Sequence, residues 1–126
     1  MRKIVLILLL LSVSIFAQDW LDYNETLAKA KDENRIVVLM LSQEGCPACE
    51  YMRNMMDDNH KISKELSKKF VVVELDIHDD EIPSKFKYFA TPTFYFTDKS
   101  GKILDVIYGR LRSKAFMKKL KEIEKK

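Results

Sequence analysis

The order of apolar and polar positions divides the chain into alternating helices and strands. Apolar side chains three and four residues apart predict amphipathic helices, and short apolar runs rich in β-branched residues predict strands. The expected helices occupy residues 20–34, 49–68 with an interruption at 57–59, 84–89 and 113–124. The expected strands occupy residues 36–41, 70–77, 93–97 and 102–108, the last two forming a hairpin through the turn residues 98–101.

This order of elements predicts an α/β fold with a central mixed sheet of four to five strands and helices on both faces. The run 36–41 is apolar at every position, as expected of a buried central strand. With 47% hydrophobic residues and only three prolines and three glycines, the composition is that of a globular chain. Residues 18–126 have the size of one compact domain with a single core.

The first 17 residues have the layout of a secretory signal peptide. Arg2 and Lys3 precede the apolar run 4–11, and the small residue Ala17 stands before the polar residues that begin at Gln18. The run is shorter than the roughly 20 apolar residues of a membrane-spanning helix. We therefore expect export to the periplasm, cleavage after Ala17 and no membrane embedding afterwards, with an uncleaved anchor as the alternative.

Charge narrows the possible partners. The whole chain has a formal charge of +3, and the signal segment contributes two of its basic residues and none of its acidic ones. Because nucleic-acid binding depends on a clear basic excess, no nucleic-acid partner is expected. The lysines of residues 114–126 alternate with apolar positions, which is typical of the solvated face of a helix. We expect a monomer.

Candidate chemistry is concentrated in Cys46 and Cys49, the chain's two cysteines, at the junction of a buried strand and a helix. Unpaired N–H groups and the positive end of a helix dipole favour thiolate over thiol, so Cys46 is the candidate nucleophile. Pro47 is tolerated in the first helical turn. Cys49 lies on nearly the same helical face, three residues later, and is the candidate resolving thiol.

Other interpretations of the pair remain open. A purely structural disulfide would close a very short loop and would contribute little stabilisation through chain entropy. A structural zinc site would need two further ligands, and His60 and His78 are isolated, being a helix-start surface residue and a solvated loop residue. We expect no metal. The methionines at 52, 55 and 56 have helical spacing, which favours core packing over soft-metal binding.

The motifs together resemble the thioredoxin family over nearly the whole of residues 18–126. The resemblance rests on Cys46-Pro47-Ala48-Cys49, on Thr91-Pro92-Thr93 opening a strand, on the turn at 99–102 and on the closing helix. It is nearest to exported thioredoxin-like reductases, including the C-terminal periplasmic domain of membrane electron-relay thiol:disulfide interchange proteins. In this family the proline matching Pro92 is cis, and the resemblance implies that Thr91 and Pro92 bind substrate.

Two positions differ from cytosolic thioredoxins. Gly45 precedes Cys46, and Met40 stands where those proteins have a buried aspartate that takes part in proton transfer. Glu74, on the neighbouring strand, and Glu44, just before the cysteine pair, are the candidates for that relay. A buried carboxylate near a thiol would have a raised pKa and could accept its proton, whereas a carboxylate that faces solvent, the alternative for both residues, would have no such role.

We therefore expect a thiol–disulfide oxidoreductase that reduces protein disulfides in the periplasm and needs no cofactor beyond the Cys46–Cys49 pair. Its partners would be protein thiols and disulfides and a membrane protein that donates electrons. A disulfide-forming oxidase or isomerase is the alternative within enzymes, because the direction depends on the reduction potential. A copper-binding module with the same fold, using Cys46 and Cys49 as ligands, is the alternative outside enzymes.

Overall fold

The computed structural model describes residues 22–126, so the predicted signal peptide at 1–17 and Trp20 lie outside the described residues. Within this range no helix is long and apolar enough to cross a membrane. The elements follow one another as α1 (Tyr23–Glu33), β1 (Ile36–Ser42), α2 (Pro47–Asp58), α3 (His60–Lys69), β2 (Phe70–Asp76), β3 (Thr93–Thr97), β4 (Ile103–Tyr108) and α4 (Ser113–Glu124).

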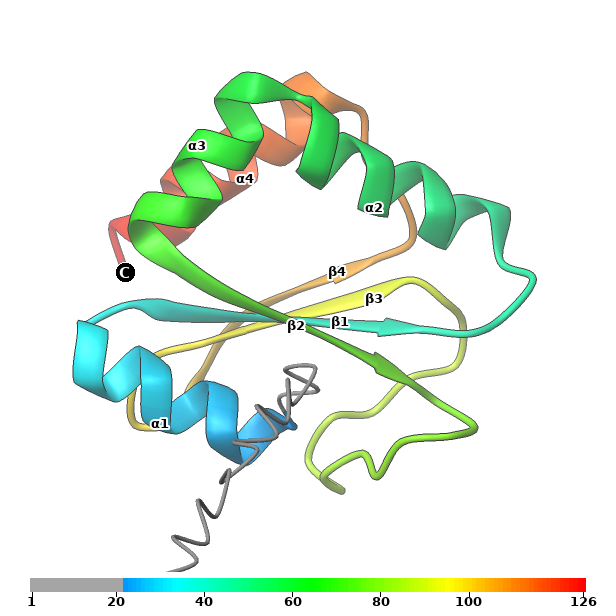
Figure 1. Cartoon of the computed structure of the whole chain (residues 1–126), viewed down its shortest axis with the longest axis horizontal. Coiled ribbons are helices and arrows are strands. Elements are labelled where there is room, and N and C mark those ends of the chain that lie inside the picture. The colour runs from blue at the N-terminus through cyan, green and yellow to red at the C-terminus, as the bar shows by residue number, and fades with distance from the viewer. Residues whose placement is uncertain (1–21) are drawn as a thin grey trace, which may run out of the picture.

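The strands of the described chain form one four-stranded sheet in the order β2-β1-β3-β4. β1 runs parallel to β2 and antiparallel to β3, and β3 is antiparallel to β4. Helices α2, α3 and α4 lie on one face of the sheet and α1 on the other (Figure 1). The predicted α/β class, the mixed sheet and the helices on both faces are confirmed.

Alternation along β1 explains how one apolar strand serves two layers, since successive side chains point to opposite faces. Val38 and Met40 belong to the core beneath α2, α3 and α4, together with Cys49. Val37 and Leu39 belong to the core that contains the buried side chains of α1. The strand next to the cysteine pair is thus fixed from both sides.

Asn59 accounts for the predicted interruption between α2 and α3. Its backbone N–H donates to the carbonyl of Met55 at 3.0 Å, which closes α2. Its side-chain Oδ1 accepts from the N–H of Ile62 at 3.2 Å, which caps the start of α3. Met52 and Met56 are buried in the core, as the helical spacing indicates.

Two of the predicted helices differ from the structure. The predicted helix at 84–89 is absent from the described chain, where these residues form turns and bends. Phe86 is buried against the rings of Tyr23 and Tyr95, with centroids 4.8 and 5.0 Å away. The hydroxyl of Tyr95 donates to the carbonyl of Lys87 at 2.7 Å. Tertiary contacts therefore hold this segment.

Helix α1 begins at Tyr23 rather than at residue 20, because Asp22 caps it by accepting from the N–H of Glu25.

Candidate functional site

Cys46 lies where the turn after β1 meets the first residue of α2. Gly45 has a φ of 70°, a left-handed conformation that glycine adopts readily, and it turns the chain toward the helix. Cys46 is the N-cap residue of α2, and its Sγ accepts from the N–H of Cys49 at 3.1 Å. Pro47 follows as the first residue of the helix. The sulfur therefore sits at the positive end of the helix, as predicted.

The two cysteines are joined by a disulfide, with their Cα atoms 5.2 Å apart. They differ in access to solvent. Cys49 is only 1% exposed and packs with Met40 and Met52, whereas Cys46 is partly exposed at the edge of the core. An incoming thiol or disulfide can therefore reach Cys46 before it can reach Cys49. The nucleophilic role of Cys46 and the resolving role of Cys49 stay predictions.

Thr91, the residue before Pro92, lies against Cys46 although it is 45 residues away in the chain. The Sγ of Cys46 is 3.8 Å from the carbonyl oxygen of Thr91 and 3.5 Å from its hydroxyl. The peptide bond between Thr91 and Pro92 is cis, and Pro92 is buried. The carbonyl of Pro92 accepts from the N–H of Gly109 at 2.8 Å, which ties this loop to the end of β4.

Gln43 and His78 also reach this site, and the sequence did not point to a role for either. The side-chain amide of Gln43 donates to the hydroxyl of Thr91 at 2.8 Å, and its carbonyl oxygen lies 3.1 Å from Nε2 of His78. Gln43 directly follows β1 and His78 follows β2, so parallel pairing of these strands brings both to one edge of the sheet. The parallel pairing of β1 and β2 was the one feature from which the contact between Gln43 and His78 could have been predicted.

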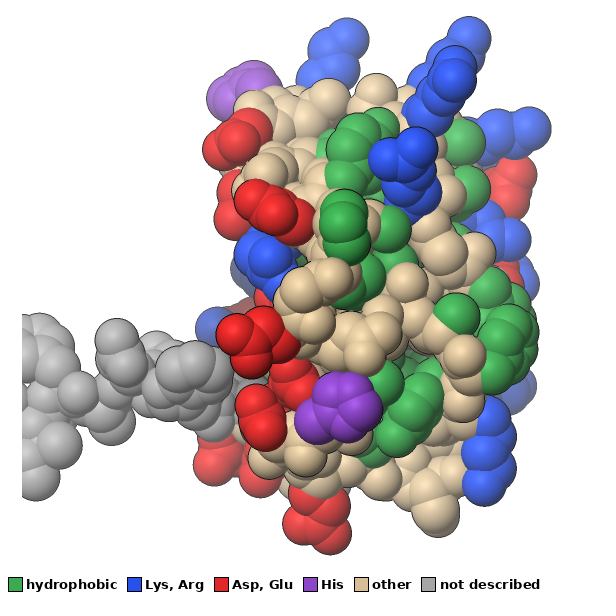
Figure 2. Space-filling model, turned by 90° about the vertical axis from the view of Figure 1, so that its right-hand side faces the viewer, with side chains coloured by type: hydrophobic (Ala, Val, Ile, Leu, Met, Phe, Trp, Pro, Cys, Tyr) green, Lys and Arg blue, Asp and Glu red, His purple; other side chains and the backbone are tan. Residues whose placement is uncertain are grey.

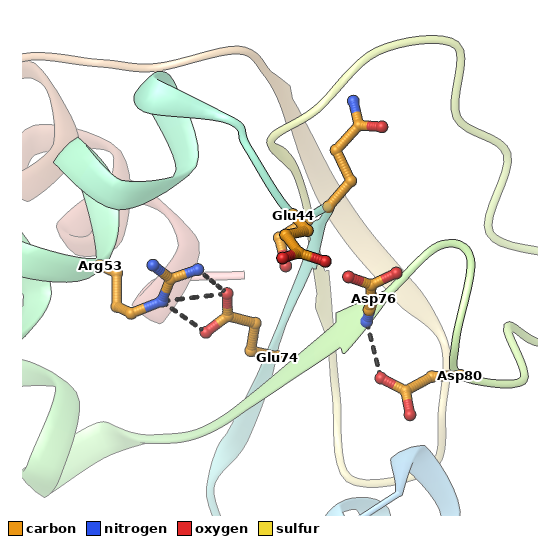
Figure 3. Close-up of a pocket in the computed structure, with 7 residues that line it drawn as sticks. Glu44, Arg53, Glu74, Asp76 and Asp80 are labelled. Atoms are coloured by element: carbon orange, nitrogen blue, oxygen red, sulfur yellow. Dashed lines mark hydrogen bonds and ion pairs between the residues drawn. The ribbon is translucent and has the colours of Figure 1, made fainter.

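Glu74 does not have the environment expected of a proton acceptor. It forms a bidentate ion pair with Arg53 of α2 (Figure 3), in which Arg53 Nε lies 3.1 and 3.0 Å from the two carboxylate oxygens. Burial alone would raise the pKa of Glu74, but hydrogen bonds from Arg53 and Ser42 and the charge of Arg53 outweigh it and lower that pKa. Glu74 thus has the solvent-facing environment that was the alternative to a buried relay carboxylate, and its paired cation on α2 could not be inferred from the strand alone.

Glu44 is exposed on the turn directly before Cys46. It lines an open pocket together with Ser42, Gln43, Arg53, Glu74, Asp76 and Asp80. In Figure 3 its carboxylate points toward the end of β2. A relay through Glu44 stays a prediction. Among residues 22–126, no group of three or more His, Cys, Asp or Glu side chains is arranged to hold a metal ion.

An apolar surface lies beside the loop that carries Thr91. Phe89 is 82% exposed and Tyr108 is 51% exposed, and their rings stack with centroids 5.0 Å apart. Phe89 precedes Thr91 by two residues, and Tyr108 pairs with Thr93 across β3 and β4. Figure 2 views this end of the molecule: apolar side chains occupy the middle and right of the face, with acidic side chains gathered along the left.

Comparisons with known proteins agree with this geometry. A model of the thioredoxin-like domain matches residues 23–124. Thioredoxin H4 of Arabidopsis thaliana is 30% identical over 86 residues, covering 66% of this chain and 67% of that protein. Thioredoxin H-type of Brassica campestris is 31% identical over 104 residues, covering 79% and 78%.

Solved structures show the same fold. A thioredoxin from Thermus thermophilus superposes with a TM-score of 0.67 at 26% identity, covering 80% of this chain and 82% of that one. The periplasmic thioredoxin SoxS from Paracoccus pantotrophus has a TM-score of 0.59 at 19% identity, covering 72% and 97%.

A cysteine pair at the tip of a helix, on this sheet and beside a cis-proline loop, defines the class of thiol–disulfide oxidoreductases. The chain belongs to the thioredoxin-like domain family, and it is a thiol–disulfide oxidoreductase of that family.

Proposed function

We propose that this protein reduces disulfide bonds in other proteins after export to the periplasm, with Cys46 as nucleophile and Cys49 as resolving thiol. The observation that carries the proposal is the unequal exposure of the two sulfurs at the start of α2, where Cys46 is accessible and Cys49 is buried. Only the thiolate attacks a disulfide, and the helix tip favours that form at Cys46.

The reaction takes place in two exchanges. The Cys46 thiolate attacks one sulfur of the client disulfide, the client S–S bond breaks, and the displaced client sulfur takes up a proton. Cys49 then loses its proton and attacks Cys46 Sγ, which breaks the mixed disulfide and releases the second client sulfur as a thiol. The client gains two electrons and two protons, and the protein retains the Cys46–Cys49 disulfide. No further cofactor takes part.

Thr91 and Pro92 would hold the main chain of the client next to Cys46. The Thr91 carbonyl lies 3.8 Å from the attacking sulfur. The exposed rings of Phe89 and Tyr108 offer apolar contact area beside that loop. Exposed aromatic pairs suit binding of a protein surface, which favours protein clients over small disulfides.

The N-terminal pattern of basic residues, apolar run and Ala17 supports export. An oxidising compartment already forms disulfides, so a small domain without an inserted helical layer fits their reversal there. Residues 77–92, between β2 and β3, contain no helix in the described chain. A reductase in that compartment needs a source of electrons. This protein, acting as a monomer, would receive them from a membrane protein that reduces the Cys46–Cys49 disulfide.

The reduction potential and the trapping of clients test this proposal. Equilibration with glutathione should give a potential well below about −200 mV, and the reduced protein should reduce insulin. A C49S variant should accumulate mixed disulfides with periplasmic proteins, whereas C46S should form none. A potential near about −120 mV would support the oxidase instead. Stoichiometric copper without insulin reduction would support the metal-binding module.

A further inference from the structure

A continuous line of hydrogen bonds connects the exposed side chain of His78 to the sulfur of Cys46. His78 Nε2 lies 3.1 Å from Gln43 Oε1, Gln43 Nε2 donates to Thr91 Oγ1 at 2.8 Å, and Thr91 Oγ1 donates to Cys46 Sγ at 3.5 Å. The four residues come from two connections: Gln43 and Cys46 lie between β1 and α2, and His78 and Thr91 lie between β2 and β3. None of these contacts caps a helix or pairs two strands.

The direction of each hydrogen bond matters more than its length. The hydroxyl of Thr91 has one proton, and it accepts from the amide of Gln43. That proton is therefore free to point at Cys46 Sγ, where it stabilises negative charge. In this arrangement every donor in the line is aimed toward the sulfur, from the His78 ring to the Gln43 amide and then to the Thr91 hydroxyl.

The arrangement with every hydrogen bond of the line reversed is also possible when His78 is neutral. An imidazole with its proton on Nδ1 can accept at Nε2, so the Gln43 amide can turn over and donate to His78. The Gln43 carbonyl would then accept the Thr91 proton, which would leave Cys46 Sγ without that donor. A protonated His78 carries N–H groups on both nitrogens and permits only the first arrangement.

We propose that Gln43 and His78 are positioning residues, which aim the Thr91 hydroxyl proton at Cys46 and so help to keep the reduced sulfur ionised. This inference rests on the proposed role of Cys46 as nucleophile and adds two residues to its machinery. Protonation of His78 fixes the line in its productive direction. The client exchange therefore begins from a thiolate whose stability depends on a side chain at the surface of the protein.

Other charged groups lie around this line, and any effect they have on the sulfur acts through space. They are Glu44 on the turn before α2, Arg53 on α2, Glu74 and Asp76 on β2, and Asp79 and Asp80 on the turn that carries His78. Their effect on Cys46 does not require the Thr91 hydroxyl. A test must therefore separate the hydrogen-bonded line from the simple removal of charge.

A double-mutant cycle on the full reduced protein makes that separation. The variants are Q43M, of similar length but without a hydrogen-bond donor, H78F, and each of these combined with T91V. The readout is the pH at which Cys46 is half ionised, followed by thiolate absorbance and by the rate of alkylation in a C49S background. D79N is the matched control, since it removes a charge from the same turn and leaves the line intact.

Q43M and H78F should each raise the pH of half ionisation by about half a unit, a change of about threefold in thiolate at a fixed pH. In the T91V background neither should have a further effect, and Q43M with H78F together should match Q43M alone. D79N should shift ionisation equally with and without T91V. An unchanged ionisation in Q43M and H78F, or shifts of full size that persist with T91V, would overturn the proposal.

The experiment has one control for folding and another for the proposed function. His78 is exposed, so H78F leaves the core untouched and keeps the test usable if Q43M is unstable. Should the wild-type protein fail to reduce insulin or ionise no more readily than free cysteine, the proposed function itself fails. Should the wild type ionise readily while the variants do not differ from it, only the positioning role fails.

Discussion

Arg53 of α2 and Glu74 of β2 form a bidentate ion pair at the edge of the sheet next to the cysteine-bearing turn. Their side chains are 42% and 32% exposed, so solvent screens much of the attraction. The pair nevertheless keeps Glu74 ionised, because its pKa lies below the ordinary value. A carboxylate that already accepts from a guanidinium is a poor acceptor for the proton of Cys49.

Replacement of Glu74 by glutamine should therefore leave the pH profile of disulfide reduction unchanged. The ion pair is partly exposed, so its loss should cost no more than about 1 kcal/mol of unfolding free energy. Urea unfolding and insulin reduction between pH 5 and pH 9 provide the two measurements. A shift in the alkaline limb of the pH profile of insulin reduction in E74Q would show that Glu74 takes part in proton transfer.

Glu44 is the carboxylate that remains for that relay. If it accepts the Cys49 proton, E44Q should slow the second exchange several-fold and leave the alkylation rate of Cys46 unchanged. The measurement is single-turnover reduction of a client disulfide, in which the mixed disulfide should accumulate. E74Q serves as the matched control from the same pocket. An unaltered profile in E44Q would remove Glu44 from the mechanism.

The carboxyl groups of Glu65 on α3 and Glu124 on α4 influence each other's pKa. Burial and the hydrogen bond with Glu65 raise the pKa of Glu124 to about 7. Hydrogen bonds from Glu124 and Lys121 lower the pKa of Glu65. Glu124 has a buried Oε1 without a hydrogen-bond partner, so its charged form is disfavoured where it lies.

The sign of the stability change follows from these directions. The folded state binds a proton at Glu124 that the unfolded chain releases near its ordinary pKa of 4.5, so this contribution is present in acid and is lost as pH rises toward 7. E124Q keeps a neutral donor at all pH values. It should raise the melting temperature at pH 8 by about 2–5 °C and change it little at pH 5. An equal effect at both pH values would contradict the raised pKa of Glu124.

Phe89 provides the prediction about clients. F89S removes the most exposed apolar side chain beside Thr91. It should raise KM for a protein substrate about threefold to tenfold, the range of about 1 kcal/mol at an interface, and leave the reduction of a small aromatic disulfide unchanged. K87S, on the same loop and outside the apolar surface, is a matched control. Equal losses on both substrates would show that the loop, not the ring, was disturbed.

The elements with a strong pattern were predictable from the sequence, as α4 and β1 show. The apolar periodicity of α4 follows from its one buried face, and the continuous apolar run of β1 follows from burial on both faces. The segment 84–89 was not, because Phe86 packs between Tyr23 and Tyr95, and such contacts between distant residues override local preference. Pattern alone could not show that residues 84–89 form turns.

The same contrast holds for the site. Cys46 and Cys49 are three residues apart in the sequence, and their chemistry depends on a helix start that the sequence reveals. Gln43 and His78 meet only because β1 and β2 pair in parallel, and Arg53 meets Glu74 only because α2 crosses that edge. Side chains whose partners come from other elements needed the structure to be recognised.

The central claim is that the sulfur of Cys46 is held ionised at the start of α2, with Cys49 behind it. The most direct measurement is the rate at which iodoacetamide alkylates the reduced protein as a function of pH, with the modified cysteine identified by mass. Modification is expected at Cys46, which should be half ionised below about pH 7.5, while Cys49 is protected. Half ionisation near about pH 8.5, as in free cysteine, or equal modification of both thiols, would contradict it.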